Sequence, residues 1–196
     1  MSNEMSALGE QGSFRLEVSG GFLLLVSVSG YLWGGGVLAA AVLAAAIHEL
    51  GHLFLILGQG AQPSRLRLDL SGACLFCAGR TPDRREELKR ALAGPVSGFL
   101  LWAALRASPA PLLRRTASLS LMLSLVNLLP ASGLDGGRVL ECILSPLDVL
   151  RSEALMAWLS FLSAALALFL GVLHSPQLFL YGAWLLFRAA RIRLPD

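Results

Sequence analysis

The feature that most constrains this chain is a long apolar stretch, residues 18–64, between two charged residues. Its only ionisable side chains are Tyr31, His48, Glu49 and His52. As a single helix this stretch would be about 70 Å long, whereas the hydrocarbon core of a bilayer is about 30 Å thick. The stretch must therefore fold back on itself.

A glycine run marks the place where the chain turns. Gly34–Gly36 follows Tyr31 and Trp33, which are aromatic residues typical of a membrane interface. We therefore expect a first span near Gly20–Trp33 and a second near Val37–Leu57.

Composition supports a membrane protein. Of the 196 residues, 55% are hydrophobic and 15% are charged, whereas a soluble domain usually carries about 25% charged residues. The mean hydropathy is +0.66. The net charge of +3 does not indicate nucleic-acid binding, because the basic residues lie at the edges of apolar blocks, where they orient helices in a bilayer.

The rest of the chain divides into a polar surface segment and further apolar blocks. Strict alternation in Arg65–Leu70 predicts a strand, and Ala73–Ala78 predicts a second, so residues 61–80 should form a surface hairpin. An interfacial helix is expected to begin near Thr81. The remaining candidate spans are Ala91–Leu105, Thr116–Leu129, Ala154–Leu173 and Gln177–Phe187.

The predicted fold is therefore an all-α polytopic membrane protein, with about six transmembrane helices and a small cytosolic β-hairpin between spans 2 and 3. We expect one domain over residues 1–196, with a flexible tail at 1–13 and no PDZ or CBS domain. No cleavable signal is apparent.

Charge places the termini. Of the 16 lysines and arginines, all but Arg106, Arg114 and Arg115 fall on the side of the termini in a six-span arrangement. The positive-inside rule then predicts a multi-pass protein of the cell membrane with cytosolic N- and C-termini.

The second span contains an H-E-x-x-H motif. His48 and His52 share one helix face and can hold a metal ion together, while Glu49 lies near enough to act on water as a general base. His48 and His52 fall in the cytosolic half of the second span, and Asp135 follows the cytosolic end of the fourth span. Asp135 is therefore the candidate third ligand. Two histidines and a carboxylate leave an open position on one Zn²⁺, as a hydrolase needs.

Plainer interpretations remain open for several residues. H-E-x-x-H arises by chance in soluble helices, although unpaired polar groups in an apolar span are costly. Asp135 before two glycines is also typical of a turn or a helix cap. Asn127 is a candidate hydrogen-bond donor to the substrate carbonyl, or simply a helix–helix partner. Cys74-x-x-Cys77 is more typical of a strand than of a metal site.

These motifs resemble those of the site-2 protease family of intramembrane zinc metalloproteases. The matching pieces are His48-Glu49-Leu50-Gly51-His52, Ala93-Gly94-Pro95 and Asn127-x-x-Pro130-x-x-x-Leu134-Asp135-Gly136-Gly137. The closest likeness is to the compact sporulation stage IV branch, which processes a pro-sigma factor. Six expected spans, a short surface hairpin and no PDZ domain support that branch.

The resemblance implies a zinc metalloendopeptidase. Zinc would be bound by His48, His52 and Asp135, with Glu49 as general base and Asn127 near the substrate. The substrate would be a membrane-tethered or transmembrane protein, such as a pro-sigma or anti-sigma factor, cut in regulated intramembrane proteolysis. The expected partners are this substrate, the lipid bilayer and an inhibitory or regulatory membrane protein, with no nucleic acid; the oligomeric state is open.

Two alternatives stand beside this hypothesis. One is a membrane zincin of another lineage, such as a prenyl-protein protease, although such enzymes usually take their third ligand from a glutamate and the sequence has Asp135. The other is a non-catalytic membrane binding or chaperone protein that retains the metal site. The intact Glu49 argues against it.

Overall fold

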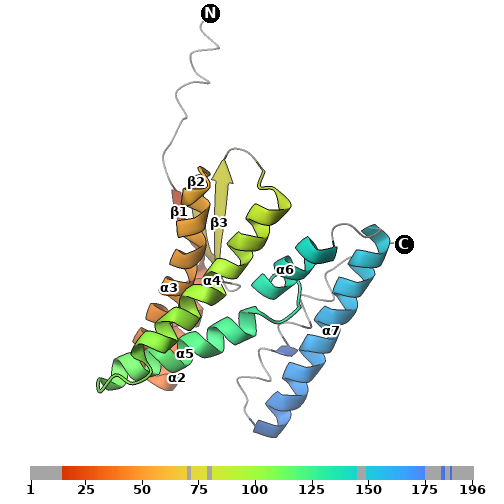
Figure 1. Ribbon diagram of the computed structural model, residues 1–196. Coiled ribbons are helices and arrows are strands. Elements are labelled where there is room, and N and C mark those ends of the chain that lie inside the picture. The colour runs from red at the N-terminus through yellow and green to blue at the C-terminus, as the bar shows by residue number, and fades with distance from the viewer. Residues whose placement is uncertain are drawn as a thin grey trace, which may run out of the picture.

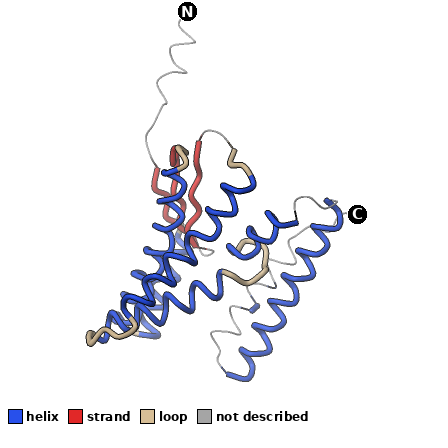
Figure 2. Tube along the Cα trace, viewed as in Figure 1, coloured by secondary structure: helices blue, strands red, loops and turns tan. Residues whose placement is uncertain are grey.

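The computed structural model describes residues 15–69, 72–78, 81–144, 149–174, 182, 183 and 186. These residues are mostly helical, with a small sheet at one end (Figures 1 and 2). The elements are β1 (Arg15–Val18), α2 (Gly20–Trp33), α3 (Gly35–Gly58), β2 (Gln62–Asp69), β3 (Gly72–Ala78), α4 (Arg84–Leu105), α5 (Pro111–Asn127), α6 (Asp135–Leu144) and α7 (Val149–His174).

The apolar N-terminal stretch does form two helices. The hydroxyl of Ser19 accepts a hydrogen bond from the Phe22 amide and caps α2. Gly34 lies between the two helices as the C-cap of α2 and the N-cap of α3, and its φ of 78° favours glycine, which carries no Cβ. The glycine turn predicted from the sequence is therefore confirmed at this position.

The predicted hairpin is present, but the sheet also contains a third strand that was not predicted. β2 and β3 pair antiparallel, as predicted, and β1 adds to the other edge of β2 in parallel, with Arg15 opposite Arg65. Parallel pairing needs a crossover connection, and here α2 and α3 together return the chain to the same end. The predicted tail at residues 1–13 lies outside the described residues.

The expected interfacial helix leads directly into the third span, because both form one helix, α4, which begins at Arg84 with the capping box of Asp83 and Glu86. The predicted start of the fourth span was wrong. α5 begins at Pro111, before the predicted Thr116, because proline suits the first helical position. The fifth span corresponds to α7. Of the predicted sixth span, only residues 182, 183 and 186 are described.

Small side chains fill the contacts among α3, α4 and α5. The small buried residues there include Ala40, Ala44, Ala91, Gly94, Gly98, Ala117, Ser120 and Ser124. Large apolar side chains instead face outward, with Phe54 77% and Trp158 75% exposed. This inversion is typical of helices packed in lipid, where small residues allow close approach.

Within the described ranges, α3 alone is long and apolar enough to count as a candidate membrane span by length and composition. The number of membrane crossings therefore stays a prediction.

Candidate metal centre

The two histidines of the H-E-x-x-H motif lie on one face of α3. His48 is buried at 3% exposure, and its Nε2 lies 3.3 Å from Nε2 of His52. The rings meet edge to face, with centroids 5.0 Å apart. The helix thus directs one nitrogen of each imidazole to a common point, as the i, i+4 spacing predicts.

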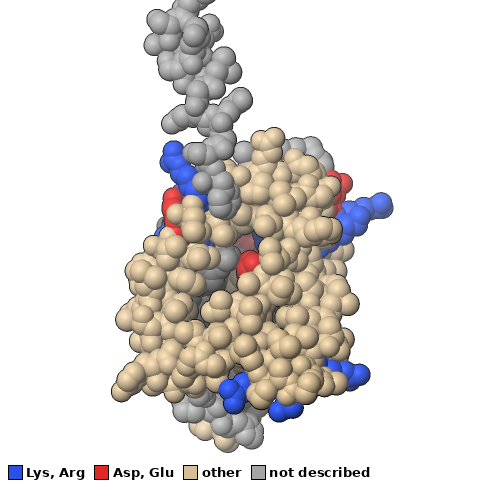
Figure 3. Space-filling model, turned by 90° about the vertical axis from the view of Figure 1, so that its left-hand side faces the viewer, with Lys and Arg blue, Asp and Glu red and all other residues tan. Residues whose placement is uncertain are grey.

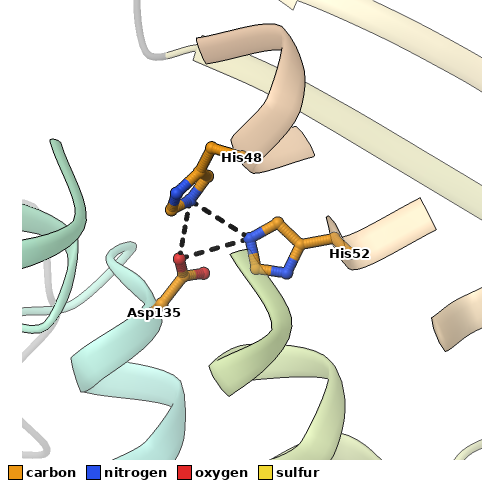
Figure 4. Close-up of side chains that lie close together, drawn as sticks. All are labelled: His48, His52 and Asp135. Carbon is orange, nitrogen blue, oxygen red and sulfur yellow. Dashed lines mark hydrogen bonds and ion pairs between the residues drawn. The ribbon is translucent and has the colours of Figure 1, made fainter. Parts of the chain in front are cut away.

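Asp135 comes to this point from the other side. It is buried at the start of α6, and its Oδ2 lies 3.0 Å from Nε2 of His48 and 3.2 Å from Nε2 of His52 (Figure 4). All three potential ligand atoms lie within 4.8 Å of one another. Residues far apart in the sequence are therefore brought together as the topology predicts.

Glycines make room for this cluster. A Cβ on Gly94 would overlap Nε2 of both histidines, and it would lie 2.6 Å from that of His48. A Cβ on Gly136 would overlap the Leu128 carbonyl in the same way. These glycines are required by close approach, which lets α4 and the segment before α6 pack against the ligands.

The free ring nitrogens differ between the two histidines. Nδ1 of His52 lies 2.7 Å from the carbonyl oxygen of Arg90, so an Nδ1–H donates there and the Nε2 lone pair is left for a metal. Nδ1 of His48 is buried and has no hydrogen-bond partner among the described residues.

Asp135 is held as a carboxylate. Burial by itself raises the pKa of this group, but hydrogen bonds with His48 and His52 outweigh that effect and lower the pKa to about 2. An ionised carboxylate is the form that binds a metal.

The predicted catalytic residues lie on two different helices. Glu49 is half-buried on α3, next to His48 in the sequence. Asn127 is the last residue of α5, and its Nδ2 donates 3.0 Å to the carbonyl of Leu123 in its own helix. In this structure one amide hydrogen of Asn127 is thus engaged within the helix.

The cysteines do not join the cluster in the described part of the chain. Cys74 and Cys77 are exposed on β3, and Cys142 is buried on α6. The group of possible metal ligands found there contains only His48, His52 and Asp135.

Two groups that position the metal ligands were not predicted from the sequence. One is the carbonyl of Arg90 described above. The other is Ser97, whose Oγ lies 3.0 Å from the Ile47 carbonyl and 2.7 Å from that of Gly94, which fixes α4 beside the residue before His48. A backbone carbonyl cannot be predicted from residue type. For Ser97, the one sequence feature that indicates close packing is Gly51, where an added Cβ would overlap the Ser97 side chain.

The residues present fit a zinc ion. Two imidazole nitrogens and one carboxylate oxygen are preferred zinc ligands, and three protein ligands leave a fourth position open. Nε2 of His48, which faces Asp135 and His52, is the ring nitrogen placed to be the ligand. The hydrogen bond of His52 to a carbonyl is the usual second interaction of a zinc-bound histidine.

This chain is similar in sequence to known metalloproteases. A family model described as Peptidase family M50 matches residues 86–170. A zinc metalloprotease of Methanocaldococcus jannaschii is 33% identical over 109 residues, which cover 50% of this chain and 31% of that protein. A candidate zinc metalloprotease of Synechocystis is 30% identical over 122 residues, covering 57% of this chain and 32% of that protein.

The matched segments thus span about a third of the length of either relative. A solved structure, the site-2 protease from Methanocaldococcus jannaschii, is similar over 92% of both chains, with a TM-score of 0.68 and 25% sequence identity. The matching family model, the two relatives and this structure together support the site-2 protease (M50) family for this chain.

Proposed function

We propose that this protein is an intramembrane zinc metalloendopeptidase. The observation that carries the proposal is the convergence of His48, His52 and Asp135 within 4.8 Å. The zinc metalloproteases among its relatives support one zinc ion at that place. The three residues would hold the ion, whose Lewis acidity polarises a carbonyl and acidifies water.

The remaining residues have roles that follow from their chemistry. The Glu49 carboxylate accepts a proton from the attacking water and passes it to the leaving amine. The contact with the Leu123 carbonyl occupies one amide hydrogen of Asn127, and the second donates to the substrate carbonyl. Asp135 stays ionised and oriented by its place at the start of α6.

The substrate is proposed to be a membrane-tethered or transmembrane protein. The apolar α3, which carries both histidines, supports this choice, because only a substrate at membrane depth reaches ligands inside such a helix. A pro-sigma or anti-sigma factor is the finer proposal, taken from the motif resemblance. Six spans with cytosolic termini complete it, since all but three of the basic residues would then face the cytosol.

The test separates metal binding from proton transfer. The Glu49→Gln variant should keep about one zinc per chain while cleavage of single-span reporter proteins falls by about 10²- to 10⁴-fold, as expected for loss of a general base. Zinc is measured by inductively coupled plasma mass spectrometry, and cleavage is measured by reporter release in reconstituted vesicles.

Glu141→Gln is the matched control, because Glu141 lies on α6 outside the metal cluster. It should retain both zinc and cleavage. Wild-type cleavage by Glu49→Gln would refute Glu49 as the base. Zinc-loaded wild type that cuts no reporter in a panel covering many transmembrane sequences would instead favour a non-catalytic binding protein.

A further inference from the structure

The end of the molecule away from the metal centre carries three arginines. Gly94 faces the metal ligands, and Arg106 lies about 18 Å further along the helix axis, at the end of α4. Arg114 and Arg115 lie near the start of α5, which follows α4 directly. All three side chains are exposed. Figure 3 shows basic side chains along this lower edge of the molecule, with no acidic side chain visible beside them.

These arginines have no acidic neighbours within the described part of the chain. The sequence contains no Asp or Glu between Glu87 and Asp135. The described acidic residues lie in β1, β2, the second half of α3, the beginning of α4, α6 and the beginning of α7. Several of them pair with other arginines, for example Glu17 with Arg65 at 3.3 Å. Arg106, Arg114 and Arg115 thus differ from the arginines around the sheet that have acidic partners.

The position of two of these arginines is electrostatically unfavourable in the protein alone. Arg114 and Arg115 lie at the N-terminal end of α5, where the helix dipole favours anions. The N-cap residue, Ala110, supplies no side-chain hydrogen bond. Two cations at a helix start without a capping carboxylate are stabilised when an anion binds between them and the free amides.

Aromatic residues place this cluster at the level of lipid headgroups. The guanidinium of Arg106 lies 5.2 Å from the ring centroid of Trp102. A Cβ on Gly36 would lie 3.4 Å from a terminal nitrogen of Arg115, so this guanidinium lies against the turn between α2 and α3. Tyr31 and Trp33 are exposed just before that turn, at 89% and 44%. Exposed tyrosine and tryptophan beside arginine are typical of the boundary between hydrocarbon and headgroups.

We propose that Arg106, Arg114 and Arg115 form a binding site for the phosphate of anionic phospholipids at the membrane face opposite the metal centre. A phospholipid fits better than an acidic protein, because the adjoining surfaces of α2, α3 and α4 are apolar and exposed. Leu32, Leu100 and Trp33 are examples, and they would contact acyl chains. Each arginine near an anionic surface is expected to strengthen binding about fivefold.

The experiment compares two double variants of the full chain purified in detergent. Arg114→Gln/Arg115→Gln removes two unpaired arginines, and Arg65→Gln/Arg67→Gln removes two paired ones near the sheet. Cardiolipin, phosphatidylglycerol or phosphatidylcholine is titrated in, and native mass spectrometry counts the lipids that stay bound. Zinc content is measured in parallel to confirm that each variant is folded.

The expected result is that the first variant loses affinity for the two anionic lipids by about 10- to 25-fold, while the second loses less than about threefold and phosphatidylcholine binding is unchanged. Equal losses in both variants would show a general effect of net charge and overturn the proposal. Unchanged lipid binding in a folded Arg114→Gln/Arg115→Gln variant would also overturn it, and would leave an acidic protein as the partner of this face.

Discussion

Two neighbouring parts of the molecule are built in opposite ways. The bundle of α3, α4 and α5 buries glycine, alanine and serine in close contacts, whereas α2 has no buried residue. α2 and α3 are both highly apolar, so hydrophobicity does not explain why α3 has buried residues and α2 has none. Close approach does, because the bundle must bring ligands from α3 and α6 together around Gly94, and α2 bears no ligand. In this molecule, tight packing marks where geometry matters to function.

Among substitutions in the bundle, we expect the largest effect on zinc binding at Gly94. In Gly94→Ala, the new methyl group would overlap Nε2 of His48 and His52, so we expect zinc affinity to fall at least about 100-fold, in line with the large effects of disturbed ligand shells. Zinc affinity is measured by competition with a chelator.

The matched control is Gly58→Ala at the end of α3, where an added Cβ meets nothing within 4 Å. This variant should bind zinc as the wild type does. Zinc affinity close to wild type in Gly94→Ala would show that the packing around the ligands is looser than the structure indicates.

A smaller effect is expected at Gly98, which lies in the same bundle but away from the ligands. A Cβ there would overlap Oγ of Ser124, whose hydroxyl is buried without a described partner. Gly98→Ala should lower the free energy of unfolding by about 1–3 kcal/mol, measured by denaturant titration in detergent. Gly20→Ala in α2, where a Cβ meets nothing within 4 Å, should leave stability unchanged or slightly higher.

A double variant identifies the cause of that loss. Ser124→Ala removes the overlapping oxygen and also a buried, unpaired hydroxyl, so it should restore much of the stability lost in Gly98→Ala. No recovery in Gly98→Ala/Ser124→Ala would assign the loss to something other than this contact, and an equal loss in Gly20→Ala would contradict the difference between α2 and the bundle.

Much of the metal site could be predicted from the sequence, because the helix period and the thickness of a bilayer limit how the chain can place its ligands. The H-E-x-x-H spacing places His48 and His52 on one helix face, and the predicted order of spans after the Gly34 turn puts Asp135 at the same end. The structure places these three side chains together. These are strong patterns because each follows from helix period or from bilayer thickness.

Other features have no such pattern. The four residues of β1 are too few to show alternation, and their parallel pairing with β2 depends on where α2 and α3 return the chain. The Arg90 carbonyl that orients His52 is a backbone group and is the same for every residue type. The start of α5 at Pro111 was missed because the prediction followed the apolar block and not the helix-start signal.

The most direct test of the central claim is X-ray absorption spectroscopy at the zinc edge on the purified full chain. We expect one zinc with two imidazole nitrogens at about 2.0–2.1 Å, oxygen ligands at about 2.0–2.2 Å and no sulfur. The imidazole signal should be lost in His48→Ala/His52→Ala. A zinc–sulfur distance of about 2.3 Å, which would require Cys74, Cys77 or Cys142 as a ligand, or purified protein that takes up no zinc, would contradict it.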